Sequence, residues 1–340
     1  MSTPPVPASA ASAAPSVPAP PVPLPPAPAV LAEVVRSGFV EGRHLGSLVV
    51  LAPDGSVEFA LGAPELPVFP RSSNKPMQAT AILRTGLDLD GELLALTAAS
   101  HSAETFHLDG VHAILAGAGL GVGALQTPPS WPLDDVEKEA WIRSGGHPEP
   151  ILMDCSGKHA AMLASCVANG WDTATYLDQD HPVQQQVLDT LQQLSGEQVV
   201  AVGVDGCGAP LMAVSLVGLA RAFRALLLAD DGTPERRVAD AMRAHPEYVA
   251  GTRRIDTWLM RGVPGSMSKM GAEAVQAVAL PDGRALAFKV DDGAYRAIGP
   301  VLAAVLRRLG VDGAGDTLNR IACAPLYGGG RPVGEIRAAF

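Results

Sequence analysis

The chain has 340 residues, 47% of them hydrophobic, which is enough to bury a large core in one domain or two. Its formal net charge of -10 argues against nucleic acid or an anionic membrane surface as a partner. No apolar stretch approaches the roughly 20 residues that a membrane-spanning helix needs, and the four cysteines follow no disulfide pattern. These features predict a cytoplasmic protein that acts on a small molecule.

Residues 1–30 differ in composition from the rest, being rich in proline and alanine. Proline lacks a backbone donor and has a fixed φ, so such a stretch cannot propagate a helix or a sheet. We therefore expect a disordered tail over residues 1–30 and a single folded domain over residues 31–340.

Two groups of β-type residues flank a stretch with a helical pattern. The β-type runs lie at residues 34–35, 48–51, 57–61, 275–280, 285–290 and 333–337. Pro-Asp-Gly at 53–55, and again at 281–283, predicts two hairpin turns. Apolar residues at helical spacing occur at 111–120, 159–169, 183–194, 211–228 and 236–243. We predict an α+β fold, with an antiparallel sheet built from both chain ends and a helical middle.

Ser72 and Lys75 stand where a polar run gives way to an apolar segment. If a helix begins there, side chains three residues apart share one face and can touch. A lysine that loses its charge on burial can take the proton of a serine hydroxyl, so the pair suggests a serine nucleophile with an amine base. The alternative is that the serine caps the helix and the lysine faces solvent.

Two later segments favour the catalytic interpretation. Polar residues 100–104 follow an apolar run, and they form either a solvated loop or a loop that carries catalytic groups. Lys269-Met270-Gly271 then precedes the β-type run at 275–280. Ser-x-x-Lys, a further serine and Lys-x-Gly, in that order, are typical of penicillin-recognising serine enzymes.

Two of the cysteines lie in segments that are rich in polar groups. Cys155 precedes Lys158 and His159 at a predicted helix start, and Cys207 follows Asp205 in a glycine-bounded turn. Two thiolates could share a zinc ion, with a nitrogen of Lys158 or His159 completing part of the shell. The alternative is that both cysteines are small, buried, apolar residues.

Arg253 and Arg254 lie in a charged turn at residues 251–257. Such a string either forms a surface salt-bridge patch or presents an arginine to the carboxylate of a substrate. The sequence leaves both interpretations open.

Five segments share their pattern with a known family, and they lie at residues 71–79, 99–104, 154–163, 204–210 and 269–273. The string Asp-Cys-Ser-Gly-Lys-His-Ala-Ala-Met-Leu at 154–163 is the most specific. On these segments the chain resembles the rhizobial-type, or class 3, L-asparaginase II family over residues 31–340. The resemblance implies a fold similar to serine β-lactamases and glutaminases, hydrolysis of L-asparagine to L-aspartate and ammonia, and a homodimer.

The resemblance also implies roles for individual residues. The implied catalytic residues form two serine-lysine pairs, Ser72 with Lys75 and Ser100 with Lys269. The implied zinc ligands are Cys155, Lys158 and Cys207. A zwitterionic substrate needs a cation and an anion, and the substrate-binding candidates are Arg71, His159 and Asp205.

In the expected reaction Ser72 gives its proton to Lys75, attacks the side-chain amide and forms an aspartyl ester that water hydrolyses. We expect Lys75 and Lys269 to titrate low, because two neighbouring buried amines disfavour a second positive charge. Arg253 departs from the family pattern, which commonly has glycine there. The alternative functions are a serine-lysine hydrolase of β-lactam or ester type and a non-catalytic amino-acid sensor.

Overall fold

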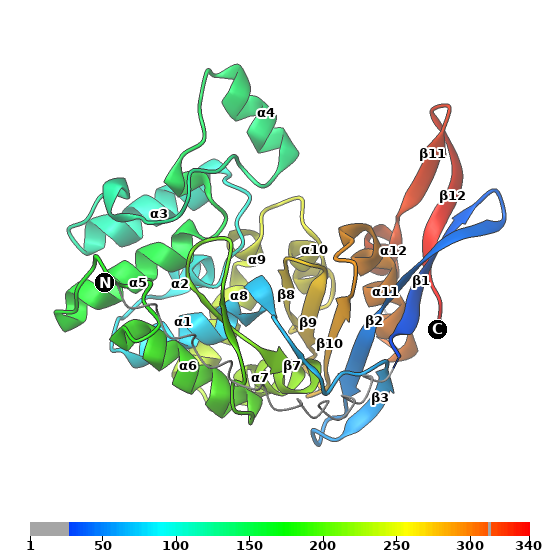
Figure 1. Ribbon diagram of the computed structural model, residues 1–340, viewed down its shortest axis with the longest axis horizontal. Coiled ribbons are helices and arrows are strands. Elements are labelled where there is room, and N and C mark those ends of the chain that lie inside the picture. The colour runs from blue at the N-terminus through cyan, green and yellow to red at the C-terminus, as the bar shows by residue number, and fades with distance from the viewer. Residues whose placement is uncertain (1–26, 312–313) are drawn as a thin grey trace, which may run out of the picture.

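The computed structural model describes residues 27–311 and 314–340 (Figure 1). Most of the predicted tail, residues 1–26, lies outside the described residues, and the first strand already begins at Ala29. Within the described ranges, no helix is long and apolar enough to cross a membrane.

One antiparallel sheet draws its strands from both ends of the chain, as predicted. Its strands are β1 (Ala29–Arg36), β2 (Phe39–Leu51), β3 (Val57–Leu61), β8 (Met267–Gly271), β9 (Val275–Ala279), β10 (Ala285–Val290), β11 (Pro325–Gly328) and β12 (Arg331–Ala338). Their order is β11-β12-β1-β2-β10-β9-β8, with β3 paired to β2. Two pairings join the two ends of the chain, β1 with β12 and β2 with β10, and in the second of them Val50 lies opposite Leu286.

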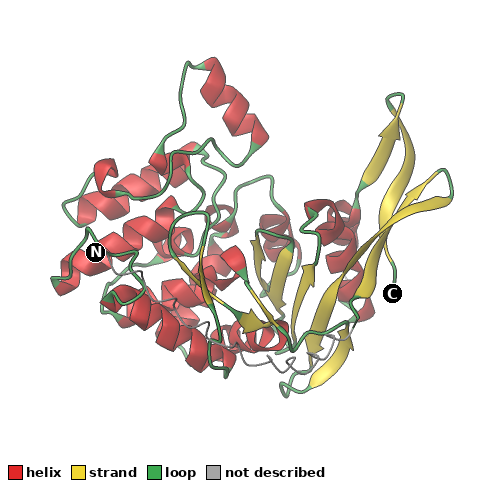
Figure 2. Ribbon diagram, viewed as in Figure 1, coloured by secondary structure: helices red, strands yellow, loops and turns green. Residues whose placement is uncertain are grey.

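The middle of the chain is helical and lies to one side of the sheet (Figure 2). Its helices are α1 (Lys75–Arg84), α2 (Gly91–Thr97), α3 (Thr105–Gly117), α4 (Asp135–Arg143), α5 (Ser156–Asn169), α6 (Pro182–Ser195), α7 (Leu216–Leu228), α8 (Pro234–Ala244), α9 (Pro246–Val249) and α10 (Ile255–Gly262). Two short strand pairs accompany them, β4 (Pro67–Val68) with β7 (Val214–Ser215) and β5 (Val202–Val204) with β6 (Pro210–Met212). The prediction of an α+β fold with a helical middle is confirmed.

The prediction of one helix over 211–228 was wrong at its start. Residues 210–212 and 214–215 are strands, and α7 begins only after Ser215, whose hydroxyl accepts a hydrogen bond from the Gly218 amide at 2.9 Å. That bond is a helix N-cap, and it fixes where the helix begins. Two helices near the carboxyl end, α11 (Ile298–Arg308) and α12 (Gly315–Ala322), were not predicted.

Alternation along the central strands buries both faces of the sheet. Leu48 and Val50 of β2 pack in a core with residues of α11, whereas Val49 and Leu51 belong to the core of the helical middle, which includes α7. Successive side chains of a strand point to opposite faces, so each face presents its own apolar row. Burying a large aliphatic side chain contributes about 1.5–3 kcal/mol. The central strands are therefore buried on both faces and lie between two apolar cores.

The start of α1 is fastened to the edge strand β8. The Ser73 hydroxyl donates a hydrogen bond to the Lys269 carbonyl at 3.1 Å. A Cβ atom on Gly271 would lie 2.5 Å from the Pro70 carbonyl oxygen, so only glycine permits this approach. This contact brings the Ser-x-x-Lys and Lys-x-Gly segments, far apart in sequence, to the same place.

Replacing Asp256 with alanine is expected to destabilise the fold. This buried carboxylate of α10 accepts hydrogen bonds from the Ser268 hydroxyl at 2.7 Å, the Met270 amide at 2.9 Å and the Gln276 side-chain amide at 3.1 Å. Losing bonds to a charged group while the donors stay buried costs about 3 kcal/mol. Urea unfolding should show a lower midpoint for Asp256→Ala than for Asp316→Ala, a control on the solvent-exposed side of α12. Equal midpoints would contradict the role given to Asp256.

Candidate active site

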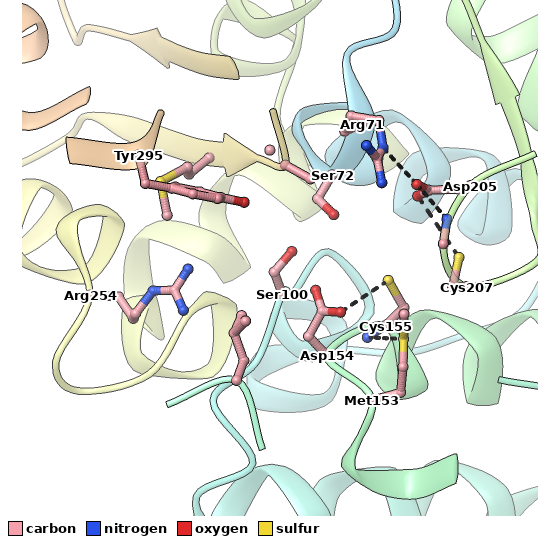
Figure 3. Close-up of a pocket in the computed structure, with 15 residues that line it drawn as sticks. Arg71, Ser72, Ser100, Met153, Asp154, Cys155, Asp205, Cys207, Arg254 and Tyr295 are labelled. Atoms are coloured by element: carbon pink, nitrogen blue, oxygen red, sulfur yellow. Dashed lines mark hydrogen bonds and ion pairs between the residues drawn. The ribbon is translucent and has the colours of Figure 1, made fainter. Parts of the chain in front are cut away.

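A cavity of about 140 Å³ lies where the sheet edge meets the helical middle (Figure 3). It is lined by Arg71, Ser72, Ser100, Leu133, Met153, Asp154, Cys155, Asp205, Gly206, Cys207, Arg254, Met270, Gly271, Ala272 and Tyr295. An apolar cavity of similar size, about 150 Å³, holds benzene. A cavity of this size suits a small molecule, and its wall carries the polar side chains of Arg71, Ser72, Ser100, Asp154, Asp205, Arg254 and Tyr295.

Ser100 joins the two lysines that the sequence singled out. Its Oγ lies 2.9 Å from the Nζ of Lys75 and 2.9 Å from the Nζ of Lys269. Lys75 opens α1 and Lys269 lies on β8, and both side chains are fully buried. The structure thus brings Ser100 together with Lys269, and it also brings Lys75 to Ser100.

Ser72 lines the cavity from the short 3-10 turn Arg71–Asn74. Within the described parts of the chain, no side-chain hydrogen bond joins it to Lys75, although the two residues are three positions apart. In Figure 3 the hydroxyls of Ser72 and Ser100 point toward the same space. Arg71, just before Ser72, has φ 51°, a left-handed conformation that is costly for a residue with a side chain. The Ser72 hydroxyl is thus presented to the cavity by a strained turn.

The pKa values of the two lysines are shifted in opposite directions. Burial lowers the pKa of Lys269 to about 7, and the charge of Lys75 also contributes to lowering it. Burial acts to lower the pKa of Lys75 as well, but the charges of Cys155 and Asp154 raise it above its ordinary value. The Lys75 ammonium also has three acceptors, the Ala99 carbonyl at 2.5 Å, the Ser100 hydroxyl and the Asp154 carboxylate at 3.4 Å. The expectation of a low pKa holds for Lys269 and was wrong for Lys75, which has anionic neighbours.

Arg71 and Asp205 face the cavity as a pair. The Nε of Arg71 donates to Oδ1 of Asp205 at 2.7 Å, and the Gly206 amide donates to the same oxygen at 2.9 Å (Figure 3). Glu273 lies 3.7 Å from a further nitrogen of Arg71. The structure therefore brings these two substrate-binding candidates together, with their charges already compensated.

The two arginines of the turn at 251–257 have different surroundings. Arg253 pairs at the surface with Asp134 at 2.9 Å and with Glu137 at 2.5 Å. Arg254 lines the cavity, and its guanidinium has no hydrogen-bond or ion-pair partner among the described residues. The salt-bridge interpretation thus holds for Arg253, and the binding of a substrate carboxylate by Arg254 stays a prediction.

The predicted zinc ligands lie together beside the cavity. Cys155 and Cys207 pack in one small buried cluster, and the Lys158 Nζ lies 3.3 Å from the Cys207 sulfur. No three His, Cys, Asp or Glu side chains converge as a metal-binding group in the described residues, so a metal site here would depend on the Lys158 amine. His159 is fully buried and does not line the cavity; its Nδ1 is paired with the Tyr176 hydroxyl at 2.7 Å.

Three residues with polar side chains in the cavity wall, Asp154, Arg254 and Tyr295, were not predicted as site residues. Asp154 lies between Ser100 and Cys155 in Figure 3, and its position inside the most specific sequence string could have identified it. Arg254 was considered only as part of its turn. Tyr295, whose hydroxyl points into the cavity, begins a short 3-10 turn (Tyr295–Ala297) after β10 and carries no sequence pattern. Such a residue is found only when the fold is known.

Solved structures similar to the chain are remote. They include a β-lactamase from Mycobacterium bovis (15% identity, TM-score 0.42, covering 77% of this chain and 94% of that one). A Bacillus glutaminase is similar at 11% identity and a TM-score of 0.42, with 78% of this chain and 91% of that chain covered. EstCE1, described as a hydrolase with promiscuous acyltransferase activity, is similar at 12% identity and a TM-score of 0.42, with 83% of this chain and 94% of that chain covered. Similarity this low carries no conclusion about chemistry. No curated protein matches the chain.

A match to a sequence profile identifies the family to which the chain belongs. The profile described as L-asparaginase II matches residues 32–338, which is nearly the whole folded part and includes every residue of the cavity wall. The chain therefore belongs to the L-asparaginase II family and is an amidohydrolase.

Proposed function

We propose that the protein hydrolyses L-asparagine to L-aspartate and ammonia through an aspartyl ester on Ser72. The observation that carries this proposal is the contact of Ser100 with two buried lysines, at 2.9 Å each, beside a small cavity that Ser72 also lines. One lysine in this arrangement is charged and the other titrates near neutrality, which is what a site needs to accept and return a proton.

Ser72 is the proposed nucleophile because its hydroxyl faces the cavity and is not engaged by another side chain in the described residues. Its Oγ attacks the side-chain amide carbon, and a tetrahedral intermediate forms. Backbone amides of the turn that begins at Arg71 are the proposed donors to the oxyanion. Collapse breaks the carbon-nitrogen bond and leaves the aspartyl ester on Ser72.

Ser100 and Lys269 move the proton in this scheme. Ser100 accepts a hydrogen bond from the Lys75 ammonium and gives its own proton to neutral Lys269 as it takes the proton of Ser72. The proton then returns by the same route to the leaving nitrogen, which departs as ammonia. In the described residues the hydroxyls of Ser72 and Ser100 form no hydrogen bond with each other. Catalytic hydrogen bonds are often long without substrate and shorten in the complex, so the relay requires this bond to form when the substrate binds. Lys269, rather than Lys75, is the proposed base.

The Arg71–Asp205 pair is the proposed site for the amino-acid headgroup. A substrate with an ammonium and a carboxylate on one carbon has the charge pattern complementary to a neighbouring guanidinium and carboxylate. The Arg71 guanidinium has further N–H donors besides the Nε–H group that donates a hydrogen bond to Asp205. The headgroup would therefore bind without breaking the pair.

Zinc is proposed at Cys155, Lys158 and Cys207, and the residues fit it. Two sulfurs and an amine within contact distance are a soft donor set of the kind zinc prefers, and the buried Nε2 of His159 has no hydrogen-bond partner in the described residues. A bound zinc ion would compensate the thiolates and keep the Lys158 amine neutral. Cys155 and Cys207 would then hold the loop before α5 against the turn that carries Asp205, as a clamp beside the cavity.

Removing the metal, or replacing Cys155 with alanine, should raise KM for asparagine more than it lowers kcat, because the clamp positions Asp205 and not the nucleophile. Steady-state kinetics after chelation, with Cys323→Ala as an exposed control, measures both constants. Elemental analysis of protein purified without chelator should find zinc. Absence of zinc would contradict the site, and loss of kcat with unchanged KM would contradict the clamp.

An ammonia-release assay with L-asparagine, L-glutamine and their D forms tests the proposed function. We expect release from L-asparagine. Hydrolysis of a chromogenic cephalosporin without release from asparagine would favour a β-lactam or ester hydrolase, and asparagine binding without release would favour a sensor. The homodimer and the cytoplasmic location expected from the sequence stay predictions, which light scattering and cell fractionation can check.

A further inference from the structure

Arg254 is a cation of the cavity wall that has no counter-ion in the part of the chain that the structure describes. It is half-buried, and no hydrogen-bond or ion-pair partner for its guanidinium occurs within residues 27–311 and 314–340. On the other side of the cavity, Arg71 has Asp205 at 2.7 Å and Glu273 at 3.7 Å. A guanidinium that is partly withdrawn from water without a partner favours an anion, so an anion that binds beside Arg254 gains a partner that is not shared with a carboxylate.

The backbone before Arg254 is held in place. Both carboxylate oxygens of Glu104 accept hydrogen bonds from Thr252, from its amide at 2.7 Å and from its hydroxyl at 2.8 Å. Gly251 has φ 125°, and a Cβ atom there would lie 2.3 Å from the Ser102 hydroxyl oxygen. Because this turn is anchored, the backbone that carries Arg254 has a defined position at the cavity wall.

The charge of Arg254 acts on a neighbouring catalytic group, the Lys269 amine. Burial is the main cause of the low pKa of Lys269, and the charge of Arg254 also contributes to it. The carboxylate of Asp256 forms no ion pair with Arg254 in the described residues, and its oxygens accept hydrogen bonds from Ser268, Met270 and Gln276. This end of the cavity is therefore suited to an anion.

The place of Arg254 relative to the hydroxyls indicates which part of a ligand it meets. In Figure 3, Arg254 and Arg71 lie on opposite sides of the cavity, and Ser72 and Ser100 lie between them. An amino acid whose headgroup is at the Arg71–Asp205 pair extends its side chain past the two hydroxyls and toward Arg254. In asparagine that end is a neutral amide, whereas in aspartate it is a carboxylate.

We propose that Arg254 binds the side-chain carboxylate of the product L-aspartate, so that the site holds a dicarboxylic amino acid by both ends and the enzyme is inhibited by its own product. This inference rests on the proposed function, from which it takes the position of the headgroup. Hydrolysis creates the charge: the carbon-nitrogen bond breaks, the oxygen of water joins the carbonyl carbon, and the new carboxylic acid loses its proton. Hydrogen bonds between charged partners are about twice as strong as neutral ones, so aspartate gains more from Arg254 than asparagine does.

Calorimetric binding of L-aspartate to the full chain tests the inference without turnover. Arg254→Met should raise the Kd of L-aspartate by about 10- to 100-fold, the range expected for losing a bond between charged groups. Binding of L-2-aminobutyrate, which has the same headgroup and no side-chain carboxylate, should be unchanged in this variant, and Arg254→Lys should keep part of the aspartate affinity. Arg261→Met is the matched control, since Arg261 lies on α10 and pairs at the surface with Glu247; it should bind aspartate as the wild type does.

Two results would overturn the inference. One is an aspartate Kd that is the same in Arg254→Met and in the wild type. The other is an equal loss of affinity for aspartate and for L-2-aminobutyrate, which would mean that Arg254 binds the headgroup or maintains the shape of the site. Failure of the wild type to release ammonia from asparagine would count against the proposed function alone, because the aspartate affinities are measured without catalysis.

Discussion

Ser72→Ala is expected to lower kcat for asparagine by about 10⁴- to 10⁶-fold, the range found when a serine hydrolase loses its nucleophile. The hydroxyl faces the cavity, so its removal leaves no unsatisfied partner in the core, and the unfolding midpoint should stay near that of the wild type. Ammonia release under saturating asparagine measures kcat, and urea unfolding measures the free energy of unfolding.

The control for this variant is Ser266→Ala, because the buried Ser266 hydroxyl has no hydrogen-bond partner in the described residues and should be dispensable. The informative comparison is with Ser100→Ala, where the nucleophile remains and only the relay is lost. We expect a fall of about 10²- to 10⁴-fold there, as for removal of a general acid-base group. If Ser72→Ala keeps most of its activity and Ser100→Ala loses it, the two serines have the opposite roles.

Lys269→Met is expected to lower kcat/KM by about 10²- to 10⁴-fold and to remove a titration from the pH profile. Lys269 acts as a base only when neutral, and its pKa is lowered to about 7 by burial. Activity of the wild type should therefore be low in acid, rise through about pH 7 and level off at higher pH. The residual activity of Lys269→Met should not rise in this window.

Lys289→Met serves as the control, since the Lys289 amine donates to the Glu273 and Val290 carbonyls and does not contact Ser100. Its profile should rise through about pH 7 like that of the wild type. A rise near pH 7 that persists in Lys269→Met would contradict the assignment of the base, and another titrating group would then have to carry the proton.

Local sequence patterns predicted the parts of this protein that depend on near neighbours. The Pro-Asp-Gly turns set the two hairpins, and the Ser-x-x-Lys spacing placed Ser72 and Lys75 at the start of α1. The contact of Lys75 with Ser100 could not be predicted from local spacing. Ser100 lies 25 residues further on, and it meets Lys75 because the loop after α2 packs against the start of α1. A spacing of three residues makes contact possible and does not require it.

Electrostatic properties were harder to predict than positions. Lys75 and Lys269 were expected to behave alike because both were predicted to be buried amines, yet Asp154 lies 3.4 Å from Lys75 and forms no ion pair with Lys269 in the described residues. Likewise Arg253 and Arg254 are adjacent in sequence, and one is paired at the surface while the other faces the cavity. Such differences depend on which carboxylates the tertiary fold brings near each cation.

Mass spectrometry of enzyme quenched in acid during turnover of L-asparagine tests the central claim most directly. The account predicts a covalent adduct with the mass of one aspartyl group, located by proteolytic mapping on the peptide that contains Ser72, with ammonia released before aspartate. The adduct should be absent from Ser72→Ala. An adduct on Ser100 or elsewhere, or rapid turnover of asparagine with no covalent intermediate at any quench time, would contradict it.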